Sequence, residues 1–116
     1  MDANGYPDER ELEAIRNWRS GDYLALLHYV EKLWRDGRVV EYQDLRTSSA
    51  DEGAHWRFAT GGCSGNEQLI LALQENTAFW LKCWKRSKRL SGWKTHQSIW
   101  EFQLPGTYEY PDEHLL

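Results

Sequence analysis

The residues with the clearest capacity for chemistry lie in one short segment in the middle of the chain, 60–67 (TGGCSGNE). Ser64 and Glu67 have the spacing of a capping box, in which each side chain accepts a hydrogen bond from the backbone amide of the other residue. This pattern predicts that a helix begins at Ser64, with its amides and the positive end of its dipole facing the glycine turn. The alternative is that the box only starts a helix and binds nothing. We expect an anion-binding site formed by Gly61, Gly62, Ser64, Gly65 and Asn66.

The segment does not have the form of a known nucleotide-binding loop. It lacks the Gly-Lys-Ser/Thr ending of a Walker A loop, and its glycines do not have the spacing of a dinucleotide-binding fingerprint. The sequence therefore predicts neither a nucleotide hydrolase nor a dehydrogenase.

One of the two cysteines, Cys63, stands just before the predicted helix, where the helix dipole would stabilise a thiolate. A nucleophilic enzyme would also need a base, and nothing in the spacing places His55 or His96 beside this cysteine. We expect His28 and His114 to be structural or solvated, and the carboxylates show no paired spacing for an acid and a base. The sequence therefore predicts no enzyme, no metal site and no cofactor.

A second candidate feature is the basic run 82–94, which holds six of the fourteen Lys and Arg residues. Trp84 and Trp93 are interleaved with these cations, and such a mixture binds phosphates and stacks on bases. We expect Arg86, Arg89 and Trp93 to complete the anion site, with Trp84 in the core. The alternative is that the cations complement the dipole at the end of a long helix.

Charge is unevenly distributed along the chain, whose net charge is −4. Residues 54–100 carry seven Lys and Arg against two Asp and Glu, whereas 1–53 carry seven against twelve and 101–116 carry four acids alone. A basic segment between acidic ones indicates either internal neutralisation or a face for an anionic ligand. The negative total makes nucleic acid a less favoured partner.

The first part of the chain predicts two helices and a weak strand. Pro7, followed by two acids, is typical of a first helical turn, and apolar residues then recur at helical spacing as far as Arg19. Asp22 is placed to cap a second helix with a broad apolar stripe, which we expect to end near Gly37. The Val and Tyr residues of 39–45 indicate a weak or edge strand.

The second part of the chain predicts a strand, a long helix and another strand. After a polar loop over 46–53, the alternation in 54–60 is typical of a half-buried strand. The apolar stripe that begins at Ser64 continues to about residues 86–89, so we expect one long central helix. Alternation over 95–104 predicts the last strand. With so few strands, parallel and antiparallel pairing are equally possible.

Together these elements predict an α+β fold, in which a small sheet of about three strands packs against one long central helix and an N-terminal helical hairpin. The 116 residues suit a single domain, with the hairpin in 1–37, a β-β-α-β core in 38–104 and an acidic tail in 105–116. No membrane span or secretion signal is evident, and the two cysteines show no metal-ligand spacing, so a cytoplasmic protein is expected.

The second half of the chain resembles small bacteriophage and prophage proteins of uncharacterised function. The resemblance covers residues 56–102 and rests on a strand ending in Thr-Gly-Gly, a Ser-Gly-Asn-Glu helix start and an aromatic-rich helix end. Cys63 stands where the shared pattern has an aromatic residue, and 90–92 stand in place of a tighter glycine turn. The matching residues are Thr60, Gly61, Gly62, Ser64, Gly65, Asn66 and Glu67 and, more loosely, Trp80, Trp84, Ser87 and Arg89.

The resemblance implies an origin and a class of function rather than a reaction. Small phage proteins of this kind commonly bind a host protein or a small signalling molecule of host defence. We therefore expect a non-enzymatic accessory protein that inhibits or sequesters a host factor, with a small nucleotide-like anion as a candidate ligand. The alternatives are a protein-binding module whose acidic and aromatic surfaces imitate nucleic acid and, with less support, a nucleic-acid-binding protein. A long helix would place the glycine turn and Arg89 roughly 30 Å apart, so the first hypothesis also predicts a homodimer.

Overall fold

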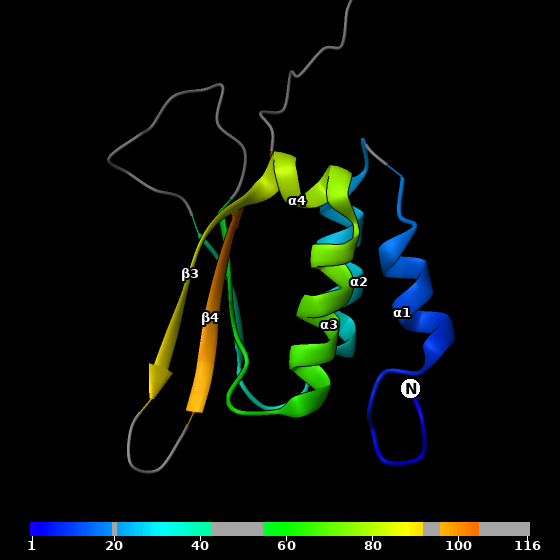
Figure 1. The fold of residues 1–116 in the computed structure, drawn as a ribbon, viewed down its shortest axis with the longest axis vertical. Coiled ribbons are helices and arrows are strands. Elements are labelled where there is room, and N and C mark those ends of the chain that lie inside the picture. The colour runs from blue at the N-terminus through cyan, green and yellow to red at the C-terminus, as the bar shows by residue number, and fades with distance from the viewer. Residues whose placement is uncertain (20, 43–54, 92–95, 105–116) are drawn as a thin grey trace, which may run out of the picture.

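Four antiparallel strands form one sheet in the part of the chain that the computed structural model describes, residues 1–19, 21–42, 55–91 and 96–104 (Figure 1). The strand order is β1-β2-β4-β3, and the described helices all lie on one face of the sheet, with α1 furthest from it. In chain order the elements are α1 (Glu9–Arg16), α2 (Tyr23–Leu33), β1 (Arg38–Tyr42), β2 (His55–Ala59), α3 (Ser64–Glu75), α4 (Thr77–Cys83), β3 (Trp84–Ser91) and β4 (His96–Gln103).

The hydrophobic core lies between the sheet and the helices α2 and α3. Trp56 and Phe58 of β2 are buried and flank the exposed Arg57, which confirms the half-buried strand predicted from the alternation. Phe102 of β4 lies opposite Trp56 and is fully buried. Burial of each such ring stabilises the fold by about 2–3 kcal/mol. The helices contribute the aliphatic side of the core through Leu26, Leu27, Val30, Leu69, Ile70 and Leu73.

The predicted α+β class is confirmed, with a sheet of four described strands rather than about three. β1 is an edge strand, as expected from its polar composition. All three strand pairs are antiparallel, which decides between the two pairings that the sequence left open.

The single long helix expected in the second half of the chain is wrong, because it is broken at Asn76. This residue has non-helical backbone angles, with φ −86° and ψ 87°. Its Oδ1 accepts from the Phe79 amide at 3.2 Å and caps α4, while its Nδ2 donates to the carbonyls of Ile15 at 2.9 Å and Trp18 at 3.1 Å. The break is therefore fixed by hydrogen bonds to a distant part of the chain, which local periodicity does not show.

The described part of the basic run forms β3, a strand that the sequence did not predict, except for Lys82 and Cys83 at the end of α4. Trp84 has extended backbone angles at the end of α4, and the chain then pairs with β4 after a register shift between Trp84 and Arg86. Pairing with β4 thus outweighs the helix propensity of the lysines and arginines. Trp84, expected in the core, is 42% exposed, and its ring stacks on Trp80 with the centroids 5.7 Å apart.

The helices of the first part are shorter than predicted. α1 begins after Pro7 because Asp8 caps it: the Glu11 amide donates to the Asp8 carboxylate, and the Asp8 amide donates to the Glu11 carboxylate, both at 2.9 Å. α2 ends before Gly37, which lies in the following turn with φ 69°. Asp22 holds the N-cap position of α2 but makes no side-chain capping hydrogen bond.

The packing of α1 ties the first helix to the centre of the molecule. α1 packs against α3, and the Trp18 ring beyond its end contacts Tyr29 of α2, with centroids 5.4 Å apart. None of the helices in the described ranges has the length and apolarity needed to cross a membrane. The predicted loop over 46–53, the end of the first predicted strand and the acidic tail lie outside the described residues.

Candidate functional site

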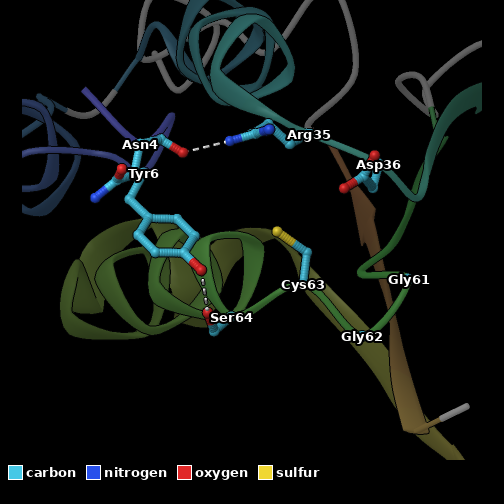
Figure 2. Close-up of a pocket in the computed structure, with 8 residues that line it drawn as sticks. All are labelled: Asn4, Tyr6, Arg35, Asp36, Gly61, Gly62, Cys63 and Ser64. Carbon is cyan, nitrogen blue, oxygen red and sulfur yellow. Dashed lines mark hydrogen bonds between the residues drawn. The ribbon is translucent and has the colours of Figure 1, made fainter. Parts of the chain in front are cut away.

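A cavity of about 410 Å³ lies at the N-terminal end of α3, between the glycine turn and the first residues of the chain (Figure 2). It contains three of the residues that the sequence predicted as an anion site. The sulfur of Cys63 points into the space between the turn and Tyr6 (Figure 2). The lining residues are Asn4, Tyr6, Arg35, Asp36, Gly61, Gly62, Cys63 and Ser64.

The capping box predicted for Ser64 and Glu67 is wrong. The N-cap residue of α3 is Cys63, which makes no side-chain capping hydrogen bond. The Ser64 hydroxyl donates instead to the Tyr6 hydroxyl at 3.4 Å, and the Glu67 carboxylate accepts from the Ser98 hydroxyl at 3.3 Å. Among the described residues, no protein group accepts from the first-turn amides 64–66. Their hydrogen-bonding capacity and the positive end of the dipole are left to solvent or to a ligand.

Two tight turns pack together to form one wall of the cavity. Gly61 and Gly62 have φ of 63° and 79°, and Asp36 and Gly37 have φ of 42° and 69°. A Cβ on Gly61 would lie 2.8 Å from the Gly37 Cα, so the two backbones can approach this closely only without side chains. This close packing of the two backbones holds Arg35 and Asp36 beside the glycine turn.

Asn66 joins the same two turns through its buried amide, which is 1% exposed. Its Oδ1 accepts from the Arg35 amide at 3.0 Å. Its Nδ2 donates to the Arg35 carbonyl and, at 3.2 Å, to the Thr60 carbonyl. The Asn66 side chain, which was predicted to bind a ligand, is therefore hydrogen-bonded to backbone groups. Its contribution to the cavity is to position Arg35.

Arg35 is the cation of the cavity, and sequence reasoning missed it. Its Nη1 donates to the Asn4 carbonyl at 2.6 Å. A Cβ on Gly5 would lie 1.8 Å from the same nitrogen, so the guanidinium packs directly on the backbone of the N-terminal segment. An arginine after a helix carries no pattern of its own. The nearest signal was the dipeptide Asp36-Gly37, which is typical of a turn.

The N-terminal segment that carries Asn4 and Tyr6 is tied to the start of α1. The amino group of Met1 forms ion pairs with Asp8 at 3.1 Å and Glu11 at 2.5 Å. Hydrogen bonding to Glu11 raises the pKa of this amino group, and a hydrogen bond from the Glu11 amide lowers the pKa of the Asp8 carboxyl. The segment therefore closes one side of the cavity as part of the fold.

The structure brings some predicted site residues together and separates others. Gly65 packs under the N-terminal segment, where a Cβ on this residue would lie 2.8 Å from the Cδ1 atom of Tyr6. Neither Arg86 nor Arg89 lines the cavity. The Nε of Arg86 donates to the Glu101 carboxylate of β4 at 2.6 Å. Trp93 lies outside the described residues.

The strand β3 nevertheless returns toward the glycine turn. Arg89 pairs with Ser98, whose carbonyl accepts from the Thr60 amide at 2.9 Å. Two strand spacings, about 10 Å, therefore separate the backbones of Arg89 and Thr60. The separation that prompted the homodimer prediction is absent, and the dimer itself stays a prediction.

Most of the chemical groups in the cavity can bind an anion. The described lining residues combine backbone amides, hydroxyl groups, one guanidinium and the carboxylate of Asp36, and no histidine is among them. His55 lies elsewhere, in β2, with its Nδ1 3.3 Å from the Lys85 Nζ. In the described ranges, no group of three or more His, Cys, Asp and Glu could hold a metal ion. The arrangement presents hydrogen-bond donors and positive charge to a ligand.

Comparison of the chain with protein-family models, with curated proteins and with solved structures gives no match in any of the three. Neither a family nor a relative therefore assigns a role to the residues of the cavity. Its ligand has to be inferred from the chemistry of the groups that line it.

Proposed function

We propose that this protein is a non-enzymatic binding protein that takes up a small anionic, nucleotide-like ligand in the cavity at the start of α3. The observation that carries the proposal is the convergence of Arg35 and an N-terminal helix turn without a side-chain cap on one cavity. A guanidinium can donate two parallel hydrogen bonds to a phosphate or carboxylate. The helix start adds backbone donors and a favourable dipole for the same group.

The rest of the lining suits the uncharged part of such a ligand. Asp36 accepts hydrogen bonds from hydroxyl groups and would repel a second anionic group. The Tyr6 ring offers a flat surface beside the Ser64 hydroxyl (Figure 2). The cavity volume of about 410 Å³ lies in the range of small-molecule sites. A phosphate bound at Arg35, with sugar hydroxyls at Asp36, fits this distribution of groups.

Sequestration of a host molecule in the host cytoplasm is the biological role that we propose. Its support is the resemblance to small phage proteins, a class that commonly acts by binding host molecules. Among the described residues, no histidine or carboxylate forms a hydrogen bond with the Cys63 thiol of the lining, which supports binding in preference to a reaction.

The alternative of nucleic-acid mimicry by the acidic N-terminal half has less support from the described contacts. The amino group of the chain pairs with Asp8 and Glu11. Arg16 pairs with Glu9 and Glu75, both at 2.9 Å. Two cations therefore offset part of the charge of these four acids within the molecule, whereas a mimic of a phosphate backbone needs its charges directed toward a partner.

Native mass spectrometry of protein purified from bacterial cells, followed by release and identification of any bound molecule, tests the proposal. Titration calorimetry with ADP and with inorganic phosphate then compares Arg35→Gln with Arg10→Gln. The second variant removes the same charge from the exposed surface of α1. We expect ADP binding to weaken about tenfold or more in Arg35→Gln and to stay unchanged in Arg10→Gln, because only Arg35 lines the cavity.

An Arg89→Gln variant completes the experiment, because the sequence predicted a clamp in the basic run. Weaker binding in Arg89→Gln with unchanged binding in Arg35→Gln would move the ligand to β3 and contradict the proposed cavity. Thermal melts of all three variants check that each one folds. The absence of a co-purified small molecule, together with no binding of ADP or phosphate, would contradict the proposed function as a whole.

A further inference from the structure

The face of the sheet turned away from the helices is rich in cations. Along β2, Arg57 and Ala59 alternate with the buried Trp56 and Phe58 and therefore point away from the core. The described helices all lie on the opposite side (Figure 1). Strand register then defines an outer face made of Arg38 and Val40 of β1, Arg57 and Ala59 of β2, Ile99 and Glu101 of β4, and Arg86 and Lys88 of β3.

This outer face has four cations and one carboxylate. Glu101 is 7% exposed and accepts hydrogen bonds from the Nε atoms of Arg57 at 2.9 Å and Arg86 at 2.6 Å. The side chains of these arginines are 46% and 60% exposed, so the carboxylate orients both guanidiniums without covering them. Arg38 and Lys88 are exposed as well. Among the described residues of this face, four cations and one acid leave an excess of three positive charges.

Two of the cations, Arg38 and Lys88, flank a small apolar floor formed by Ala59 and Ile99. Arg57 and Arg86 belong to one row of residues across the sheet, with one strand between them, and Arg38 and Lys88 belong to the next row, with two strands between them. At a strand spacing of about 4.8 Å, their backbones are about 10 Å and about 14 Å apart, respectively. Ala59 and Ile99, which are half-buried and apolar, lie between Arg38 and Lys88, whereas Glu101 lies between Arg57 and Arg86.

We propose that the outer face binds single-stranded nucleic acid, with phosphates at the four cations and base rings against the apolar floor. Single strands are bound by positively charged surfaces that follow the backbone, with bases stacked on aromatic rings and on arginine guanidiniums. The three arginines of the outer face supply charge and planar groups for stacking, and the apolar floor supplies a contact for a base. This interaction uses none of the cavity residues and does not depend on the ligand proposed there.

Side-chain chemistry favours nucleic acid over other acidic partners. Three of the four cations are arginines, whose planar guanidinium binds phosphate through two hydrogen bonds and also stacks on bases. An acidic protein would be anchored by large apolar side chains, and the described residues of the outer face include no exposed one. An anionic lipid surface would use the charge but not the floor.

In the described part of the chain, the acids around α1 lie away from the outer face and therefore do not oppose binding of a polyanion there. Acids gather in the N-terminal part at Asp8, Glu9, Glu11 and Glu13, around α1. This helix lies furthest from the sheet, with α2 and α3 between them (Figure 1). Repulsion across the layer formed by α2 and α3 is largely screened at physiological salt, where the Debye length is about 8 Å.

Fluorescence anisotropy with labelled oligo(dT) and oligo(rA) of about twelve residues tests the proposal at low and at physiological salt. The variant Arg38→Gln/Lys88→Gln removes two exposed cations of the outer face. The control Arg10→Gln/Lys32→Gln removes the same charge from exposed positions on the helices. We expect the first variant to bind about tenfold more weakly or worse, and the slope of log K against log salt to fall by about 1.4. The control should bind as the unmodified protein does.

Three results would overturn the proposal. The first is no binding of either oligonucleotide at low salt. The second is equally weakened oligonucleotide binding in both double variants, which would mean that binding depends only on the total charge of the protein. The third is stronger binding to a duplex of the same length, or to vesicles containing phosphatidylserine, than to the single strands. Circular dichroism melts of both variants establish that any loss of binding occurs in folded protein.

Discussion

The cavity at the start of α3 and the outer face of the sheet both collect positive charge, but they are built differently. The cavity is formed by two glycine turns and by the buried amide of Asn66, with one cation, Arg35. The outer face consists of exposed side chains on strands whose opposite side is already buried. The residues that shape the cavity therefore also stabilise the fold, whereas Arg38 and Lys88 of the outer face can be replaced with little effect on what lies beneath them.

Among the replacements that test this difference, replacement of Asn66 should cause the largest loss of stability. Asn66→Ala leaves the amide of Arg35 and the carbonyls of Arg35 and Thr60 without the partner that they have in the buried site. Each buried polar group left unpaired costs about 1–3 kcal/mol, so we expect a loss of about 3 kcal/mol or more in the free energy of unfolding. Urea unfolding followed by tryptophan fluorescence measures the loss.

Asn4→Ala is the matched control for this prediction. Asn4 also lines the cavity, but its exposed side chain makes no hydrogen bond with another described residue, and its carbonyl would still accept from Arg35. We expect a change within about 0.5 kcal/mol. If Asn66→Ala cost no more than Asn4→Ala, Asn66 would not hold the two turns together.

The comparison also explains how much of the fold the sequence could predict. Alternation predicted β2 and most of β4 because side chains that face the core repeat every second residue, a property of the strand alone. The break at Asn76 could not be predicted in this way, because its partners, the carbonyls of Ile15 and Trp18, are about sixty residues away. The basic run became a strand for the same reason, since its pairing with β4 is a contact between separate segments.

Gly37→Ala should have the next largest effect. A Cβ at this position would lie 2.2 Å from the Ala59 carbonyl oxygen, and φ is 69°, so the substitution adds both a clash and backbone strain. We expect a loss of about 2–3 kcal/mol. Gly21→Ala is the control, because Gly21 has φ 100° but nothing within 4 Å of a Cβ. Urea unfolding of both variants separates the clash from the strain, and equal losses would show that the two turns do not need their close approach.

The candidate site was predicted in part, for a physical reason. Glycines in sequence mark a tight turn wherever they occur, so Gly61 and Gly62 could be assigned to the cavity. Ser64 was predicted at the helix start, although its hydroxyl contacts Tyr6 in place of the expected box. Arg35 could not be identified, because its place depends on hydrogen bonds to Asn66, thirty-one residues away.

Glu101→Gln tests whether the carboxylate of the outer face stabilises the fold as well as orienting its arginines. Burial raises the pKa of Glu101, but hydrogen bonds and charges from Arg86 and Arg57 outweigh it, so the pKa lies below its ordinary value of 4.5. A lowered pKa means that the stabilisation is present above pH 4.5 and is lost as the pH falls through the folded-state pKa. We expect Glu101→Gln to lose about 1 kcal/mol near pH 7, since both arginines are partly exposed.

Urea unfolding at neutral and at acid pH distinguishes this effect from a general loss of packing. The difference between Glu101→Gln and the unmodified protein should shrink toward zero below the ordinary pKa of 4.5, because protonation removes the same charge from the unmodified protein. Glu13→Gln, on the exposed surface of α1, is the control and should show no such pH-dependent difference. A loss in Glu101→Gln that is the same at both pH values would contradict the ion-pair explanation.

The smallest effect on stability is expected from Arg38→Gln/Lys88→Gln, the variant with the largest expected loss of nucleic-acid binding. Both side chains are exposed, and the core lies on the other side of the strands that carry them. Substitutions at such positions usually change the free energy of unfolding by less than about 0.5 kcal/mol each. Urea unfolding measures this on the protein used for the anisotropy titrations. A loss of 1 kcal/mol or more would mean that these cations help to hold the sheet together, and the contrast between a cavity tied to the fold and a separable outer face would then be wrong. An unchanged stability with weakened binding would show that the sheet presents these cations for a partner.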